Sequence, residues 1–223
     1  MKKLAVKITL LLLLMMALLI TGCNNSTEPT PNPNPNEPPP GQEEPGNTEK
    51  PPEDKVTLGD YLPLTVGSTW QYLGEGNEYA TFSREVMFAQ GNRAQIKEDN
   101  GGTVSALVYE VTEDTITTIY SQGESYENEN FLDAEPNDDL IILKTPLEVG
   151  TKWETKDGTR EIIDLNASLD TPAGKFDQLI KVEIIYPDST MYEYYKAGVG
   201  LIKREFLSEG FEVTSTLEKY EIK

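Results

Sequence analysis

The stretch PLTVGSTW at residues 63–70 recurs as PLEVGTKW at residues 146–153, with five identities at the same spacing. We call these two stretches the first and the second corner. In each corner we expect proline to set the entry, two apolar residues to dock on a core, glycine to make a tight bend, and tryptophan to begin and cover a strand. Recurrence after 83 positions predicts two related half-sheets, each opened by one corner. Chance recurrence is the alternative, because the flanking residues differ.

Strand signals dominate the chain around the corners. Segments rich in Thr, Val, Ile and Tyr lie at residues 103–111, 115–120, 160–165, 179–186 and 211–220. Turn signals fall between them, most clearly at 99–102, 157–158 and 171–174. These patterns predict an all-β fold, with an antiparallel curved sheet that forms a sandwich or a partly open barrel. A short helix is expected at most near residues 58–62 or in the acidic segment 127–139.

The first 22 residues have the layout of a bacterial export signal. Three lysines precede an apolar segment at residues 8–20, which is short for a spanning helix of about 20 residues. It ends in ITGC at residues 20–23, which resembles the lipobox of bacterial lipoproteins, where cleavage precedes a cysteine that receives acyl chains. We therefore expect a lipoprotein signal peptide at 1–22 and lipidation of Cys23. A retained transmembrane helix and ordinary signal-peptidase cleavage are the alternatives.

Composition divides the remaining chain into a linker and a domain. Residues 24–55 hold ten of the fifteen prolines and no aromatic or aliphatic side chain. Proline-rich chains extend by about 3.1 Å per residue, so about 30 residues reach about 100 Å. We expect the lipidated cysteine and a Pro/Asn/Glu-rich linker at residues 23–55, followed by one β-rich extracytoplasmic domain at residues 56–223. A proline-rich ligand for a peptide-binding groove is the alternative for the linker, but its spacing shows no docking motif.

Charge and composition exclude several classes of site and partner. The chain has no histidine, which removes Ser-His-Asp and Cys-His catalysis and histidine-ligated zinc or haem. Lipidation of Cys23 would remove the only thiolate, so we expect no cofactor and no metal centre. Without the three signal lysines, 16 basic residues face 38 acidic ones, a net charge of −22. Nucleic acid is therefore not an expected partner, and the acyl chains on Cys23 must hold the protein to the membrane.

Acidic clusters raise two further alternatives, calcium binding and the carboxylate pair of a glycosidase. The residues concerned are Glu124, Glu127 and Glu129, and Glu135 with Asp138 and Asp139. The segment 133–139 lacks the alternating oxygen ligands and closing glutamate of an EF-hand loop. We expect a solvated loop there and assign no catalytic residue.

Tyrosines on one predicted strand form the candidate partner surface. Tyr192 and Tyr194 share one face of this strand, and Tyr195 takes the other. Exposed tyrosine rings stack on sugars or pack against proteins, so we expect Tyr192 and Tyr194 to contact an envelope polymer or an envelope protein. The alternative is that these rings cover the interior of the sheet.

The chain resembles a known group of proteins in several places. These are the first corner with the following GEGNEYA (74–80), the turn at 171–176, and the closing YYKAGVGLIK (194–203). They look like a β-rich domain of Gram-positive, Firmicutes-type envelope lipoproteins, and the resemblance spans nearly all of residues 61–223. In that family the domain stands alone after a lipobox or follows other extracytoplasmic modules. No activity is established for it, so the resemblance implies compartment and fold and leaves function open.

Three functions of different classes fit these features. The preferred hypothesis is a lipoprotein anchored on the extracytoplasmic face of the cell membrane, acting as a non-catalytic binding or structural module of the cell envelope. The alternative is a carrier of a lipophilic ligand in a β-barrel-like cavity. A carboxylate hydrolase is the third, weakened by the missing histidine and nucleophile. A filled interior would favour the module, and an open apolar cavity would favour the carrier.

Replacement of Cys23 by serine tests the anchor. Acyl transfer needs the thiol, so we expect Cys23→Ser to leave the protein unlipidated and largely uncleaved. The measurement is labelling of cells with an alkynyl fatty acid. Label retained on the variant would contradict the lipoprotein hypothesis.

Overall fold

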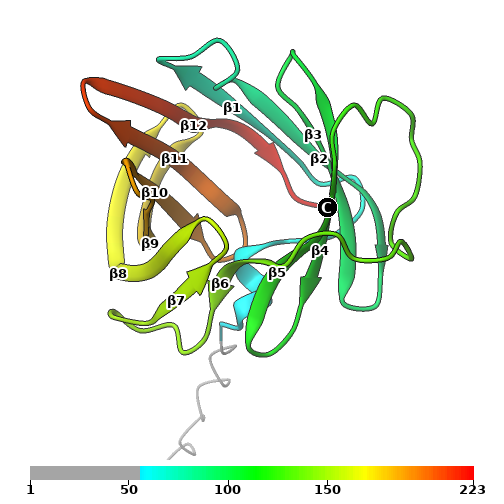
Figure 1. The fold of residues 1–223 in the computed structure, drawn as a ribbon, viewed down its shortest axis with the longest axis horizontal. Helices are drawn as coiled ribbons and strands as arrows, with labels where there is room; N and C mark the ends of the chain where they lie inside the picture. Colours follow the sequence, from blue (N-terminus) through cyan, green and yellow to red (C-terminus); the bar gives the residue numbers. More distant parts are fainter. Residues whose placement is uncertain (1–55) are drawn as a thin grey trace, which may run out of the picture. The chain divides into compact units, whose positions relative to one another are not determined.

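The computed structural model describes residues 56–223, which form one antiparallel sheet curved into a nearly closed barrel (Figure 1). A single 3-10 turn, η1 (Leu58–Tyr61), precedes the first strand. The strands are β1 (Thr69–Glu75), β2 (Phe82–Gln90), β3 (Arg93–Asp99), β4 (Val104–Val111), β5 (Thr115–Gln122), β6 (Leu140–Lys144), β7 (Lys152–Thr155), β8 (Gly158–Thr171), β9 (Gly174–Ile185), β10 (Ser189–Lys196), β11 (Gly200–Ser208) and β12 (Phe211–Glu221). The predicted signal peptide, Cys23 and the linker lie outside the described residues.

The strand order divides the sheet into two halves. Strands β1 to β6 form one up-and-down meander and β7 to β12 form the other, and the halves join where β1 pairs with β12. The first corner leads into β1 and the second into β7. The expected all-β antiparallel sheet is confirmed, as a partly open barrel whose two halves each follow one corner.

Both corners make the same backbone hydrogen bonds. Gly67 N donates to Val86 O at 2.9 Å, and Gly150 N donates to Ile162 O at 2.8 Å. The amides of Val86 and Ile162 donate back to the carbonyl that follows each glycine. The two glycines have φ values of 85° and 92°, a left-handed conformation that side chains disfavour. Each corner is thereby fixed to a buried position on the second strand of its own half.

The valines of the corners face solvent, which corrects the expectation that both apolar residues dock on the core. Val66 is 51 % exposed and Val149 is 62 % exposed, whereas Leu64 and Leu147 pack against the core. A backbone hydrogen bond closes a turn around each valine. The turn places the valine at its tip, where the side chain points away from the barrel.

Side chains close the barrel between β6 and β7. These two strands are the edges of the sheet and lie next to each other, but they share no backbone ladder within it (Figure 1). Trp153 Nε1 donates to the β6 carbonyl of Ile141 at 3.0 Å, and Arg160 Nη1 donates to that of Ile142 at 2.9 Å. These buried side chains satisfy edge carbonyls that a paired strand would otherwise engage.

The turn η1 closes one end of the barrel. Leu58 and Leu62 belong to the main apolar core. Asp60 O accepts from Gly198 N at 2.7 Å, and Trp70 Nε1 donates to Val199 O at 2.7 Å, so η1 and the first corner are both fastened to the β10–β11 turn. The helix expected near residues 58–62 is therefore this short 3-10 turn.

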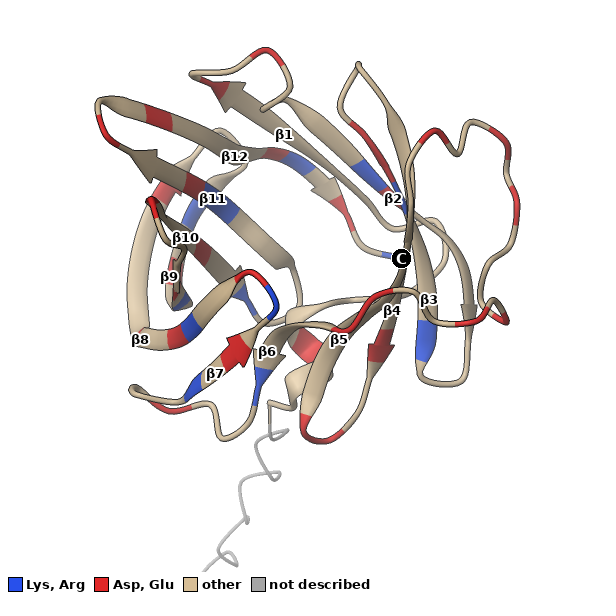
Figure 2. Cartoon of the chain, viewed as in Figure 1, with Lys and Arg blue, Asp and Glu red and all other residues tan. Residues whose placement is uncertain are grey.

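The acidic segment between β5 and β6 is a loop on the outer face of the barrel, so the second of the two positions considered for a short helix, residues 127–139, is not helical. Phe131 and Leu132 are buried in a second apolar cluster with Val108. Buried Gln95 donates to Glu129 O at 2.8 Å and accepts from Phe131 N at 2.7 Å. These contacts hold the loop as extended chain. Figure 2 shows acidic residues along this loop and on several strand-connecting turns.

The other elements predicted from sequence are present. The five predicted strand segments fall in β4, β5, β8, β9 and β12, and each of the three predicted turns lies between consecutive strands. In the described part of the chain no helix has the length and apolarity needed to cross a membrane.

Both corner tryptophans should contribute strongly to stability. Trp70 is 3 % exposed and Trp153 is 5 % exposed, and each indole also donates a hydrogen bond. We expect Trp70→Ala and Trp153→Ala each to lower the free energy of unfolding by about 3–5 kcal/mol, as buried large-to-alanine changes do. Urea denaturation of the purified protein measures this. A nearly silent change at either position would refute the role of that corner.

Candidate functional site

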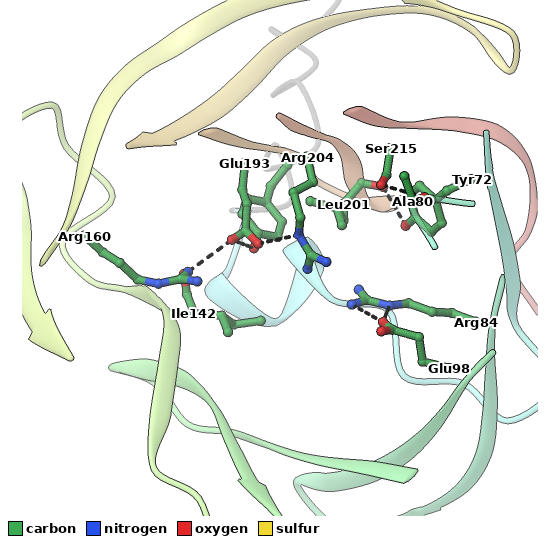
Figure 3. A network of polar contacts seen from close by, with 11 residues as sticks. Tyr72, Ala80, Arg84, Glu98, Ile142, Arg160, Glu193, Leu201, Arg204 and Ser215 are labelled. Atoms are coloured by element: carbon green, nitrogen blue, oxygen red, sulfur yellow. Dashed lines mark hydrogen bonds and ion pairs between the residues drawn. The ribbon is translucent and has the colours of Figure 1, made fainter. Parts of the chain in front are cut away.

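The inner face of the barrel carries charged side chains in the middle of its apolar core (Figure 3). Arg84 on β2 and Glu98 on β3 are cross-strand neighbours. The Arg84 Nε and Nη2 atoms lie 2.7 and 2.6 Å from the same Glu98 oxygen. Because side chains alternate along a strand, Arg84 shares its face with buried Phe82 and Val86 and must point inward.

Glu193 on β10 is the centre of a second ionic group. One carboxylate oxygen accepts from Arg160 on β8 at 3.1 Å and from the Tyr195 hydroxyl at 2.6 Å. The other oxygen accepts from Arg204 on β11 at 3.1 Å. Arg160 also donates to the Ile142 carbonyl on β6, across the gap between the edge strands β6 and β7. Glu193 therefore links strands β8, β10 and β11 to the β6 edge of the sheet.

Burial and ion pairing act in opposite directions on these groups. Burial raises the pKa of the Glu193 carboxyl, but Arg160 and Arg204 outweigh it and lower the pKa from 4.5 to about 2. Burial likewise raises the pKa of Glu98, and the opposing attraction of Arg84 lowers it on balance. Burial and the Glu193 charge raise the pKa of Tyr195. Both carboxyls are therefore ionised at neutral pH, and Tyr195 keeps its proton.

The ionic groups line a cavity of about 220 Å³ inside the barrel. Its lining includes Leu62, at the end of η1, and the exposed residue Ser121 on β5. Asp138 also lines the cavity and pairs with Lys156 at 2.8 Å. The arrangement is a small, partly open space whose lining combines charged and apolar side chains.

Each half of the sheet repeats one feature of this site. Trp70 pairs in register with Arg84, and Trp153 pairs in register with Arg160. Each corner tryptophan therefore has a buried arginine beside it on the next strand. The sequence repeat did not reveal this, because 14 residues separate the first pair and 7 the second.

The interior charges were missed in the sequence, although a signal for them exists. Glu193 stands two residues from Met191 and from Tyr195, and Arg84 stands two residues from Phe82 and from Val86. A charged residue at an apolar register position of a strand predicts a buried, paired charge. Which arginine meets which carboxylate is not readable, since Arg160 and Glu193 lie 33 residues apart.

The predicted tyrosine surface is only partly exposed. Tyr195 lines the cavity, and Tyr192 and Tyr194 lie on the opposite face of β10, as strand periodicity predicts. Tyr194 is only 7 % exposed, however, and the Lys181 ammonium lies 4.0 Å from the Tyr192 ring centroid and 5.2 Å from that of Tyr194. The expected row of two exposed rings is wrong for Tyr194. A partner contact at Tyr192 and Tyr194 stays a prediction.

The acidic residues considered for calcium or glycoside hydrolysis lie in the loop between β5 and β6. Asp138 is the member of that set that lines the cavity, where Lys156 neutralises it. Within residues 56–223 no group of three or more carboxylate, cysteine or histidine side chains is placed to hold a metal ion.

The barrel is similar to two solved structures. One is a protein of Bacteroides fragilis described as exported and as having a YmcC-like fold. The two sequences are 13 % identical, the alignment covers 72 % of this chain and 98 % of that chain, and the TM-score is 0.46. The other, from Parabacteroides distasonis and described as a lipoprotein, has 16 % identity, the same coverage and a TM-score of 0.42. At these scores the likeness carries no conclusion.

No protein-family model and no curated protein matches the chain. The two solved structures give the Firmicutes-type assignment no support, and it stays a prediction.

Loss of the Glu193 charge should destabilise the fold and change its response to acid. Glu193→Gln leaves Arg160 buried without its counter-ion, so we expect a loss of about 3–5 kcal/mol at neutral pH. Because the folded pKa is depressed, the ionised carboxyl stabilises fully above pH 4.5, and this contribution is lost as pH falls toward about 2. The variant should therefore show a flatter stability profile between these pH values. Urea denaturation across that range measures both effects.

Glu110→Gln is the matched control. Glu110 pairs with Arg93 at 2.9 Å on the outer side of the barrel, and the two side chains are 30 % and 35 % exposed. Such pairs contribute about 0–1 kcal/mol. Equal losses in the Glu193 and Glu110 variants would contradict a central role for the interior network.

Proposed function

We propose that the chain is a lipoprotein anchored on the extracytoplasmic face of the cell membrane, and that its barrel is a non-catalytic binding module of the cell envelope. The observation that carries the proposal is the order of its parts: a lipobox-like sequence ending in Cys23, a proline-rich linker, and a self-contained barrel. A long extended linker lets such a domain reach partners away from the membrane surface.

The state of the interior carboxylates supports a non-catalytic role. A glycosidase needs one carboxylic acid whose raised pKa lets it donate a proton near neutral pH. In the barrel both Glu98 and Glu193 have lowered pKa values and are held by arginines. Neither is suited to be the general acid, so these carboxylates favour structure or binding over hydrolysis.

The character of the interior favours a binding module over a lipophilic carrier. A carrier of an apolar ligand needs an apolar cavity, and ligand pockets for drug-sized molecules measure about 300–1,000 Å³. The interior cavity measures about 220 Å³ and is lined by three arginines. A second groove, of about 910 Å³, lies beside η1 and is partly open to solvent. An apolar ligand would meet charged groups in the interior cavity.

Protease treatment of intact cells tests the location. In a bacterium with lipoprotein processing, we expect full-length protein with a C-terminal epitope to fractionate with membranes and to lose its epitope to protease added outside the membrane. The Cys23→Ser variant should differ in processing. A soluble cytoplasmic protein would contradict the proposal, and so would turnover of an envelope polymer by the purified protein.

A further inference from the structure

We propose that the cavity inside the barrel binds a small oxyanion, a phosphate group or a carboxylate, through Arg204 with Arg84 and Arg160 beside it. This inference rests on the binding role proposed above and deepens it by naming the site and the ligand class.

Arg204 has hydrogen-bonding capacity that the barrel does not use. Arg84 is engaged by Glu98 and Arg160 by Glu193. Among residues 56–223 the Arg204 guanidinium donates one hydrogen bond, from Nε to Glu193. Its two terminal nitrogens, Nη1 and Nη2, are therefore available to a ligand. The Arg204 side chain is 31 % exposed although it lies inside the barrel, so this surface faces the cavity. Figure 3 shows its guanidinium between Glu193 and the Arg84–Glu98 pair.

The arginines converge on the same space. The guanidinium carbons of Arg84 and Arg204 lie 5.3 and 5.8 Å from the centroid of one ring, that of Phe82. Two neighbouring positive charges repel, and an anion bound between them relieves that repulsion. Arg160, which lines the same cavity and is 4 % exposed, has a buried Nε without a hydrogen-bond partner.

The balance of charge around the cavity favours an anion. Arg84 is paired with Glu98, whereas Arg160 and Arg204 share the single carboxylate of Glu193. The ionic group around Glu193 therefore has one positive charge in excess. The chain as a whole has a net charge of −19, so its general field repels anions while this interior site attracts them.

The size and donor geometry limit the ligand. At about 30 Å³ per water molecule, a cavity of about 220 Å³ holds about seven waters. That is room for phosphate or a short carboxylic acid and not for a drug-sized molecule. The planar fork of a guanidinium matches the two oxygens of a carboxylate or phosphate.

Calorimetric titration of the full-length protein, purified in detergent at neutral pH, tests the proposal. Inorganic phosphate and succinate are the two probes. We expect one saturable site for at least one of them, weakened by added sodium chloride. The probe that binds more tightly assigns phosphate or carboxylate as the preferred ligand.

Two matched variants locate the site. Arg204→Gln removes the charged fork and should weaken binding about tenfold or more, the cost of a lost charge-assisted hydrogen bond. Arg93→Gln should leave the affinity unchanged: Arg93 is 35 % exposed and donates from Nε to Glu110 at 2.9 Å, but lies outside the cavity.

The absence of saturable binding by the unsubstituted protein would overturn the proposal, and so would unchanged affinity in a folded Arg204→Gln variant. If that variant does not fold, the arginine Nε–Hε resonances of the unsubstituted protein decide the matter. Probe-dependent shifts of the Arg204 and Arg160 resonances support the site, and constant resonances overturn it. Because this test uses purified protein, its result is separate from that of the cell-location experiment.

Discussion

Closure of the sheet between β6 and β7 is the constraint on which the rest of the barrel depends. Ladder hydrogen bonds join all the other neighbouring pairs of strands in the described sheet. Between β6 and β7, the seam of the barrel, the two strands lie side by side without a ladder. The Trp153 indole and the Arg160 guanidinium supply hydrogen bonds to β6 instead. An arginine can do this inside a core only if its charge is balanced. The hydrogen bond that Arg160 makes to β6 therefore depends on Glu193 as its counter-ion. Glu193 in turn is held by Tyr195 and Arg204.

The ionic interior has an energetic cost that shapes its role. A buried ion pair loses hydration, and its attraction offsets this loss only with good geometry and additional hydrogen bonds. Glu193 meets this condition with donors from Arg160, Tyr195 and Arg204. Arg204 shares a carboxylate that already has a partner, so the group carries surplus positive charge beside a cavity. The structural demand at the seam and the proposed binding role thus arise from the same side chains.

The two halves of the sheet show how much of this was readable in the sequence. The repeated corners predicted that each half opens with a buried tryptophan, and both tryptophans are buried. Their neighbours were less predictable. Val66 and Val149 look like core residues by composition, but the turn around each of them directs the side chain to solvent. Tyr194 looked exposed by alternation, yet it is buried on the outer face beneath Lys181. Alternation specifies a face of the sheet, and whether that face is covered depends on other segments.

The sequence by itself determined the antiparallel β architecture, several turns and the two corners, because these follow from local residue preferences and short-range periodicity. It also supplied the prediction of a lipid anchor at Cys23, which lies outside the described residues. Only the tertiary structure decided that the sheet curves until β6 meets β7, and that Arg84, Arg160 and Arg204 converge on one cavity with Glu98 and Glu193. Barrel closure brings together side chains from strands far apart in the chain, and no local pattern encodes which of these distant charges meet.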